Sequence, residues 1–161
     1  MTSPNPERRL AELGLSLPDV VTPVAAYVPA VLTGRHVYTA GQLPMVEGRL
    51  AATGKVGAGI GTAEAAGLAR ICALNALAAA ASVTGGLSGI RRIVKVTGFV
   101  ASAPDFTEQA EVVNGASEVL IEIFGDAGRH ARSAVGMAVL PRDAPVEVEL
   151  IAEVTESVAG A

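Results

Sequence analysis

The segment Ala131–Glu149 (ARSAVGMAVLPRDAPVEVE) constrains the fold more than any other, because polar and apolar side chains alternate in it twice. Successive side chains of an extended chain point to opposite faces, so this period of two predicts two β-strands, each with one apolar face. Arg132 lies between small residues on the first strand, and Glu147 and Glu149 share one face of the second. A charged side chain among small neighbours leaves room for a ligand, so this segment is the best candidate site.

The short connection between these strands predicts how far apart their charges lie. If Leu140–Pro145 forms a tight hairpin, antiparallel pairing puts Arg132 near Thr155 and Glu147 near Val139. Arg132 and Glu147 would then lie about seven residues apart along the strands, or roughly 23 Å at ~3.3 Å per residue. No pair of side chains spans that distance. The two residues can line one pocket only if they come from different subunits, so we expect an oligomer.

Periodicity and turn signals divide the remaining chain into one short helix, two long helices and three strands. The expected elements are a helix over 6–13, strands over 27–32 and 36–40, a glycine-rich loop over 48–61, a helix over 62–83, a strand over 90–101 and a helix over 104–124. With the two strands above, this order predicts a mixed sheet with two helices packed on one face, an α+β fold. The other face, which we expect to carry Arg132, Glu147 and Glu149, has nothing in the chain to cover it.

We expect one domain over residues 20–156, preceded by an extension over 1–19 and followed by a tail over 157–161. Half of the 161 residues are apolar, but many are alanine and only 3% are aromatic, so the core has few large anchors. Burial against sister subunits would compensate for this. The net charge of −4 disfavours nucleic acid as a partner, since a phosphate backbone normally requires a basic face.

Cellular location is indicated by three features of the chain. The first residues lack the apolar run of a signal peptide. The uncharged run between Arg70 and Arg91 contains too many glycines and polar residues for a membrane span, and it favours a buried helix ending at Gly85–Gly86. The single cysteine, Cys72, cannot form an internal disulfide, which favours a reducing compartment. We therefore expect a cytoplasmic protein with no membrane partner.

No residue pattern favours a metal or a cofactor. The glycines of Gly57–Gly61 lack both the further glycine of a dinucleotide motif, since residue 62 is threonine, and the lysine of a phosphate-binding loop. His36 and His130 match no metal-ligand spacing with Cys72, so structural roles are expected for both histidines and an inert buried thiol for the cysteine.

Arg132 has two interpretations of equal weight. An arginine within a small, apolar strand lowers stability unless its guanidinium is paired, so it could form a structural salt bridge with a glutamate. It could equally hold the carboxylate of a ligand, because the planar guanidinium matches a carboxylate in two hydrogen bonds.

Several short motifs follow one another in a distinctive order. They are Tyr27, Thr39–Pro44 (TAGQLP), Phe106 with Asn114, Ala131–Val135 (ARSAV), Leu140-Pro141 and Val146–Glu149 (VEVE). Over roughly residues 20–154, their order and spacing resemble the Rid family, also called YjgF/RidA or endoribonuclease L-PSP.

This resemblance implies a chorismate-mutase-like fold, assembled as a homotrimer with sites in the clefts between subunits. Members that resemble RidA hydrolyse enamines and imines such as 2-aminoacrylate to 2-oxo acids and ammonia, without a metal or cofactor. By the resemblance, Arg132 would hold the substrate carboxylate and Glu147 would position or activate the water. The residues that would shape the pocket are Tyr27, Asn114, Ala134 and the backbone of Gly41.

The chain departs from the family pattern in two places. Ala134 stands where many members have a cysteine, and the chain is longer, with an N-terminal extension and a longer Gly48–Gly61 loop. Two other functions compete with deamination. One is a non-catalytic trimer that senses a small carboxylate metabolite, with Arg132 kept and Glu147 structural. The other is RNA cleavage, which the acidic charge and the lack of a histidine pair disfavour.

Overall fold

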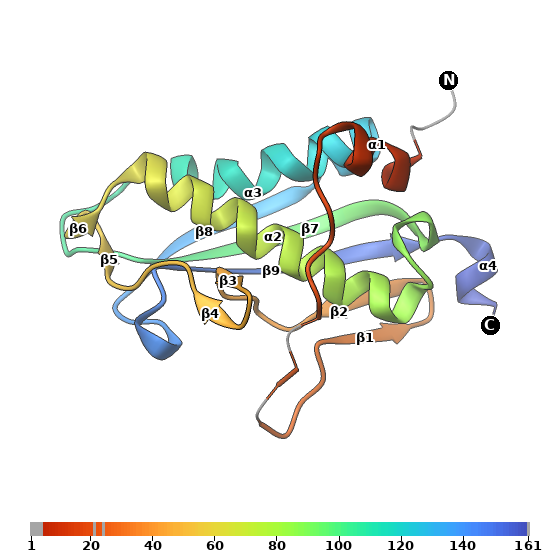
Figure 1. Cartoon of the computed structure of the whole chain (residues 1–161), viewed down its shortest axis with the longest axis horizontal. Helices are drawn as coiled ribbons and strands as arrows, with labels where there is room; N and C mark the ends of the chain where they lie inside the picture. Colours follow the sequence, from red (N-terminus) through yellow and green to blue (C-terminus); the bar gives the residue numbers. More distant parts are fainter. Residues whose placement is uncertain (1–4, 21, 24, 161) are drawn as a thin grey trace.

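A five-stranded mixed sheet with two long helices on one face forms the body of the protein (Figure 1). The computed structural model describes residues 5–20, 22–23 and 25–160. The strand order is β1-β2-β9-β7-β8, and every neighbouring pair is antiparallel except β7 and β8. The strands are β1 Ala30–Thr33, β2 His36–Thr39, β7 Ile90–Ala101, β8 Ala131–Met137 and β9 Val146–Val154. The prediction of a mixed α+β fold is confirmed.

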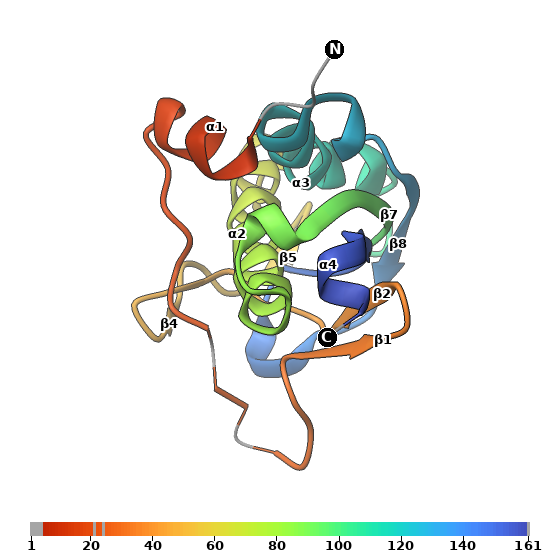
Figure 2. The same ribbon diagram turned by 90° about the vertical axis from the view of Figure 1, so that its right-hand side faces the viewer.

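The two long helices, α2 (Thr62–Thr84) and α3 (Gln109–Phe124), pack on each other and on the same side of the sheet (Figure 2). Glycines allow the layers to approach closely. A Cβ atom at Gly115 of α3 would overlap the carbonyl oxygen of Ala66 in α2, and one at Gly98 of β7 would overlap Val113 of α3. Close packing of small side chains therefore fills the core of a chain that has few aromatic residues.

The β1–β2 hairpin, α2 and β7 lie where the sequence predicted them, although β1 begins at Ala30 and not at Tyr27. Thr33 pairs with His36 across the expected turn. α2 ends at Gly85, which has a left-handed backbone (φ 74°) that glycine adopts without strain. By length and composition α2 could cross a membrane, but more than half of its most apolar stretch is buried in the protein, as in a core helix.

The structure corrects the start of α3, which begins at Gln109 and not at Pro104. The preceding residues form a turn in which the amide of Phe106 donates to the carbonyl of Ala103. The Phe106 side chain packs over Gly57, where a Cβ would lie 3.0 Å from the Cβ of Phe106. This contact holds the turn against the glycine-rich segment, and α3 begins only after it, at Gln109.

The segment expected to be a glycine-rich loop contains three short strands, and a fourth immediately precedes it. β3 (Met45–Val46) and β4 (Arg49–Leu50) form an antiparallel hairpin, whereas β5 (Lys55–Val56) and β6 (Gly59–Ile60) pair with each other in parallel. Strands of two residues carry no periodicity that a sequence pattern could reveal.

β8 and β9 do not form the predicted hairpin, because β7 lies between them. Val96 of β7 is opposite Arg132 of β8 on one side and opposite Leu150 of β9 on the other. The cause is α3, because a helix that connects two strands of one sheet returns the chain to its starting edge, and the second strand then runs parallel to the first. The connection from β8 to β9 passes the end of β7. There the backbone N–H of Ser102 donates a hydrogen bond to the carbonyl of Met137.

The two charged positions lie on opposite faces of the sheet, which corrects a second prediction. Arg132 shares a face with the fully buried Val96 and therefore points towards the helices. Glu147 is opposite Phe99 and points to the open face, as does Glu149 opposite Thr97. Of the three charged residues expected on the uncovered face, only Glu147 and Glu149 lie there.

The ends of the described chain pack against this body. α1 (Pro6–Glu12), which the sequence predicted, begins at the cap residue Asn5 and packs against α3. From α1 the chain runs as an extended strap across α2 (Figure 1). A short helix, α4 (Glu156–Ala159), follows β9.

Candidate active site

Arg132 is held in place by one face of α3. Its Nη1 donates to Oδ1 of Asn114 (2.8 Å) and to Oγ of Ser117 (3.2 Å), and its Nη2 donates to the carbonyl of Ala110 (3.2 Å). Within the described part of the chain, Arg132 forms no salt bridge. A structural ion pair inside the protomer is therefore not the role of this arginine.

These contacts leave part of the guanidinium available. Of its five N–H groups, the three hydrogen bonds occupy both of Nη1 and one of Nη2. Nε–H and the second N–H of Nη2 have no partner among the described residues. Arg132 is only partly buried, so each of these remaining N–H groups can donate a hydrogen bond to a carboxylate oxygen.

Ser117 connects Arg132 to His130. The Ser117 hydroxyl lies 2.9 Å from Nε2 of His130, whose Nδ1 lies 2.7 Å from the carbonyl of Gly128. A carbonyl can only accept, so Nδ1 carries the proton and Nε2 accepts from the hydroxyl. Burial is the largest effect on the pKa of His130 and lowers it; the hydrogen bond with Gly128 opposes this, and the charge of Arg132 adds a smaller lowering.

Glu147, which belongs to β9, has its carboxylate beside Gly41. A Cβ at position 41 would overlap Oε1 of Glu147, so only glycine leaves room for this carboxylate. The contact is maintained by a bridge in which Gln42 and Val148 exchange backbone hydrogen bonds of 2.8 and 3.0 Å. Burial, and after it the charge of Glu149, raises the pKa of Glu147.

The predicted site residues thus form two separate groups within one protomer. Arg132 is near Asn114, and Glu147 is near Gly41, but the groups face opposite sides of the sheet. Arg132 and Glu147 are three residues apart along the strands and two strands apart across the sheet. At ordinary sheet dimensions their Cα atoms are about 14 Å apart. The separation of about 23 Å between Arg132 and Glu147 that a hairpin predicted was wrong. One protomer still cannot place both side chains in one pocket.

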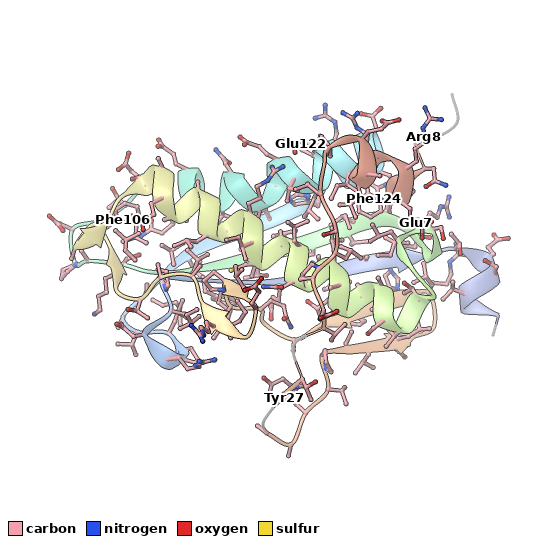
Figure 3. The ribbon with its side chains drawn as sticks, viewed as in Figure 1. Glu7, Arg8, Tyr27, Phe106, Glu122 and Phe124 are labelled. Atoms are coloured by element: carbon pink, nitrogen blue, oxygen red, sulfur yellow. The ribbon has the colours of Figure 1, made fainter. Side chains whose placement is uncertain are left out.

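The remaining two predicted residues are placed differently. Ala134 shares the helix-side face with Arg132 and packs against the core. Tyr27 is 56% exposed and lies on a loop that projects from the body, where Figure 3 labels it. No described hydrogen bond joins the Tyr27 side chain to either group of site residues.

Ser117 and His130 were missed as site residues by the sequence interpretation. A helical signal for Ser117 was present, because it follows Asn114 by three positions and Ala110 by seven, and such residues share one helix face. His130 had only its closeness to Arg132 in the sequence, which is a weak signal.

Metal ligation receives no support from the described residues, among which no three His, Cys, Asp or Glu side chains cluster. Cys72 is fully buried, as the sequence predicted, and burial raises the pKa of its thiol well above the usual range. Such a thiol is a poor nucleophile.

The geometry defines an α+β sheet protein with a partly buried arginine on one sheet face and a half-buried glutamate of raised pKa on the other. Residues 7–154 match the model of the family described as "YjgF/chorismate mutase-like, putative endoribonuclease", and the chain belongs to this family. The resemblance found in the sequence is thereby confirmed.

Individual relatives agree with this assignment. Protein TCP17 of Trypanosoma cruzi is 41% identical over 145 residues, which is 89% of this chain and 91% of that protein. The crystal structure of Atu1372 from Agrobacterium tumefaciens is 48% identical, with a TM-score of 0.86 over 93% of this chain and 92% of that one. The crystal structure of Escherichia coli TdcF with bound serine is 26% identical, with a TM-score of 0.62 over 84% and 94%.

Proposed function

We propose that the protein hydrolyses small enamines or imines of the 2-aminoacrylate type to 2-oxo acids and ammonia. The observation that carries the proposal is Arg132, a guanidinium fixed by α3 with two N–H donors left over. That arrangement suits the carboxylate of a 2-imino acid. TdcF, a relative, has a structure with bound serine, an amino acid that carries a carboxylate of this kind.

Hydrolysis of an imine needs few catalytic groups beyond the one that binds the substrate. The imine carbon is already electrophilic, so the protein must orient the substrate and a water molecule and supply a base. Glu147 suits the role of the base, because its raised pKa makes it more basic than an ordinary carboxylate. The Glu147 carboxylate accepts a proton from the water as the water oxygen bonds to the imine carbon, and the electrons of the C=N π bond move to the nitrogen, which takes up a proton. The resulting carbinolamine then loses its hydroxyl proton and breaks its C–N bond, so that the carbon becomes the 2-oxo group and the nitrogen, protonated once more, leaves as ammonia.

The site would lie between subunits of a homotrimer. Arg132 of one subunit and Glu147 of the next would face the same substrate, and the projecting Tyr27 would add to the pocket. Support comes from the open sheet face, which exposes large apolar side chains of a kind that a sister subunit would cover. They are Val31, Tyr38, Val135 and Met137.

Ammonia release from iminopyruvate generated in situ tests the reaction. The expected result is release faster than the spontaneous rate, with a dependence on Arg132. Tight binding of pyruvate without any rate enhancement would instead support the sensor function. Cleavage of RNA, which the family description mentions, has less support here because the chain has a net charge of −4.

A further inference from the structure

A cavity separate from both groups of site residues lies on the helix side of the molecule. Its volume is about 630 Å³, within the range of small-molecule sites. Three segments enclose it: residues 16–19 of the extended strap, residues 71–75 of α2, and residues 45–48 of the β3–β4 hairpin. Its apolar lining consists of Leu17, Pro18, Met45, Val46, Ile71 and Leu74.

Asn75 is the one deeply buried polar residue in this lining, with 3% of its surface exposed. Its Nδ2 donates to the carbonyls of Leu43 and Met45, both at 3.1 Å, which ties α2 to the segment before β3. These two bonds also fix the orientation of the amide. Its Oδ1 is buried and accepts no hydrogen bond from the described residues. This oxygen has almost no accessible surface, so it lies behind the cavity wall, and Asn75 supports that wall through its two Nδ2 hydrogen bonds.

The rim of the cavity is negatively charged. Asp19 of the strap and Glu47 of the hairpin turn lie on its edge, and both are exposed. Neither forms a salt bridge with a described residue. No lysine, arginine or histidine is among the lining residues. The two carboxylates on the rim therefore offer negative charge above an apolar floor.

We propose that this cavity binds a small primary amine with an apolar body. The ammonium group would lie near Asp19 and Glu47, and the apolar body would cover Leu74 and its neighbours. The proposal concerns a site separate from Arg132 and does not depend on the deaminase function.

The test uses the full-length protein in its native oligomeric state and three probes of similar size. These are 2-phenylethylamine, neutral 2-phenylethanol and anionic 3-phenylpropionate. Isothermal titration gives the affinities, and NMR chemical-shift changes locate the site. The amine should bind at least tenfold more tightly than either other probe, with shifts confined to residues 16–19, 45–48 and 71–75.

A double variant, Asp19→Asn with Glu47→Gln, should weaken amine binding about tenfold and leave 2-phenylethanol unaffected, because only the charged rim is changed. Glu64→Gln, an exposed glutamate in the first turn of α2, is the matched control and should bind as the wild type does. Equal affinity for the three probes, shifts elsewhere, or a double variant that binds the amine normally would each overturn the proposal.

Discussion

Arg132 and Glu147 stand on opposite faces of one sheet, with β7 between their strands and about 14 Å between their Cα atoms. Asn114 and Ser117 hold the arginine from the helix side, while Gly41 makes room for the glutamate on the other. One chain therefore cannot bring the two side chains together. The proposed site between subunits would do so, and it can be tested directly.

Replacing Arg132 should greatly reduce turnover. Arg132→Ala removes the carboxylate clamp and should lower kcat/KM for iminopyruvate by roughly a hundredfold or more. Arg132→Lys keeps the charge but loses the planar pair of donors, so an intermediate loss is expected. Arg129→Ala, an exposed arginine that pairs with Asp126, is the control and should keep normal activity. A near-normal rate for Arg132→Ala would contradict the proposed role.

Mixed oligomers distinguish a shared site from one within a single chain. Arg132→Ala and Glu147→Gln proteins should each be inactive alone, but subunits exchanged in equal amounts should recover about one quarter of the wild-type activity. Each complete site needs an intact arginine from one subunit and an intact glutamate from its neighbour, each with a chance of about one half. If both residues came from one chain, mixing would restore nothing. Light scattering at micromolar concentration should also show a trimer, and a monomer would contradict the assembly.

Gly41→Ala should damage the site while leaving the fold intact. The new methyl group would overlap Oε1 of Glu147 and displace the carboxylate, so kcat should fall at least tenfold. Gly67→Ala provides a matched control, because nothing lies within 4 Å of a Cβ at that position in α2. In a helix interior that change should stabilise the protein by up to about 1 kcal/mol without affecting turnover. Equal activity of the two variants would count against Glu147 as the base.

The pH dependence of kcat/KM should report the environment of Glu147. Burial and then the charge of Glu149 raise the pKa of Glu147, and a base acts only when deprotonated. The rate should therefore rise with pH through a value above that of an ordinary glutamate. Glu149→Gln removes the like charge and should move this rise to lower pH, though not fully, because burial remains the larger cause. A profile that does not move would show that Glu149 is not coupled to catalysis.

His130 should make the folded state less stable at acid pH. Its pKa is lowered from the usual 6.5 in the folded protein, mainly by burial, so the unfolded chain binds the proton more readily. The corresponding stability is fully present above pH 6.5 and is lost as the pH falls through the lower, folded value. Urea unfolding between pH 8 and pH 5 measures this loss, which His130→Gln should reduce. An equal acid sensitivity of wild type and variant would exclude His130 as the cause.

Much of the fold was predictable from local pattern. The alternation in Ala131–Glu149 predicted both strands, and helical spacing predicted α2 and most of α3. The apolar face of β9 packs on the helices as expected, but that of β8, with Val135 and Met137, is the uncovered one. The start of α3 was wrong because Phe106 takes part in a contact with Gly57, far away in the sequence. A contact of that kind leaves no periodic signal.

The sequence by itself determined where the long helices and the strands of the main sheet lie and which family motifs are present, because these depend on near neighbours in the chain. Only the tertiary structure decided that β7 separates β8 from β9, and hence that Arg132 faces the helices while Glu147 faces outwards. Strand pairing joins residues far apart in the sequence, and the crossover through α3 outweighed the short connection that suggested a hairpin.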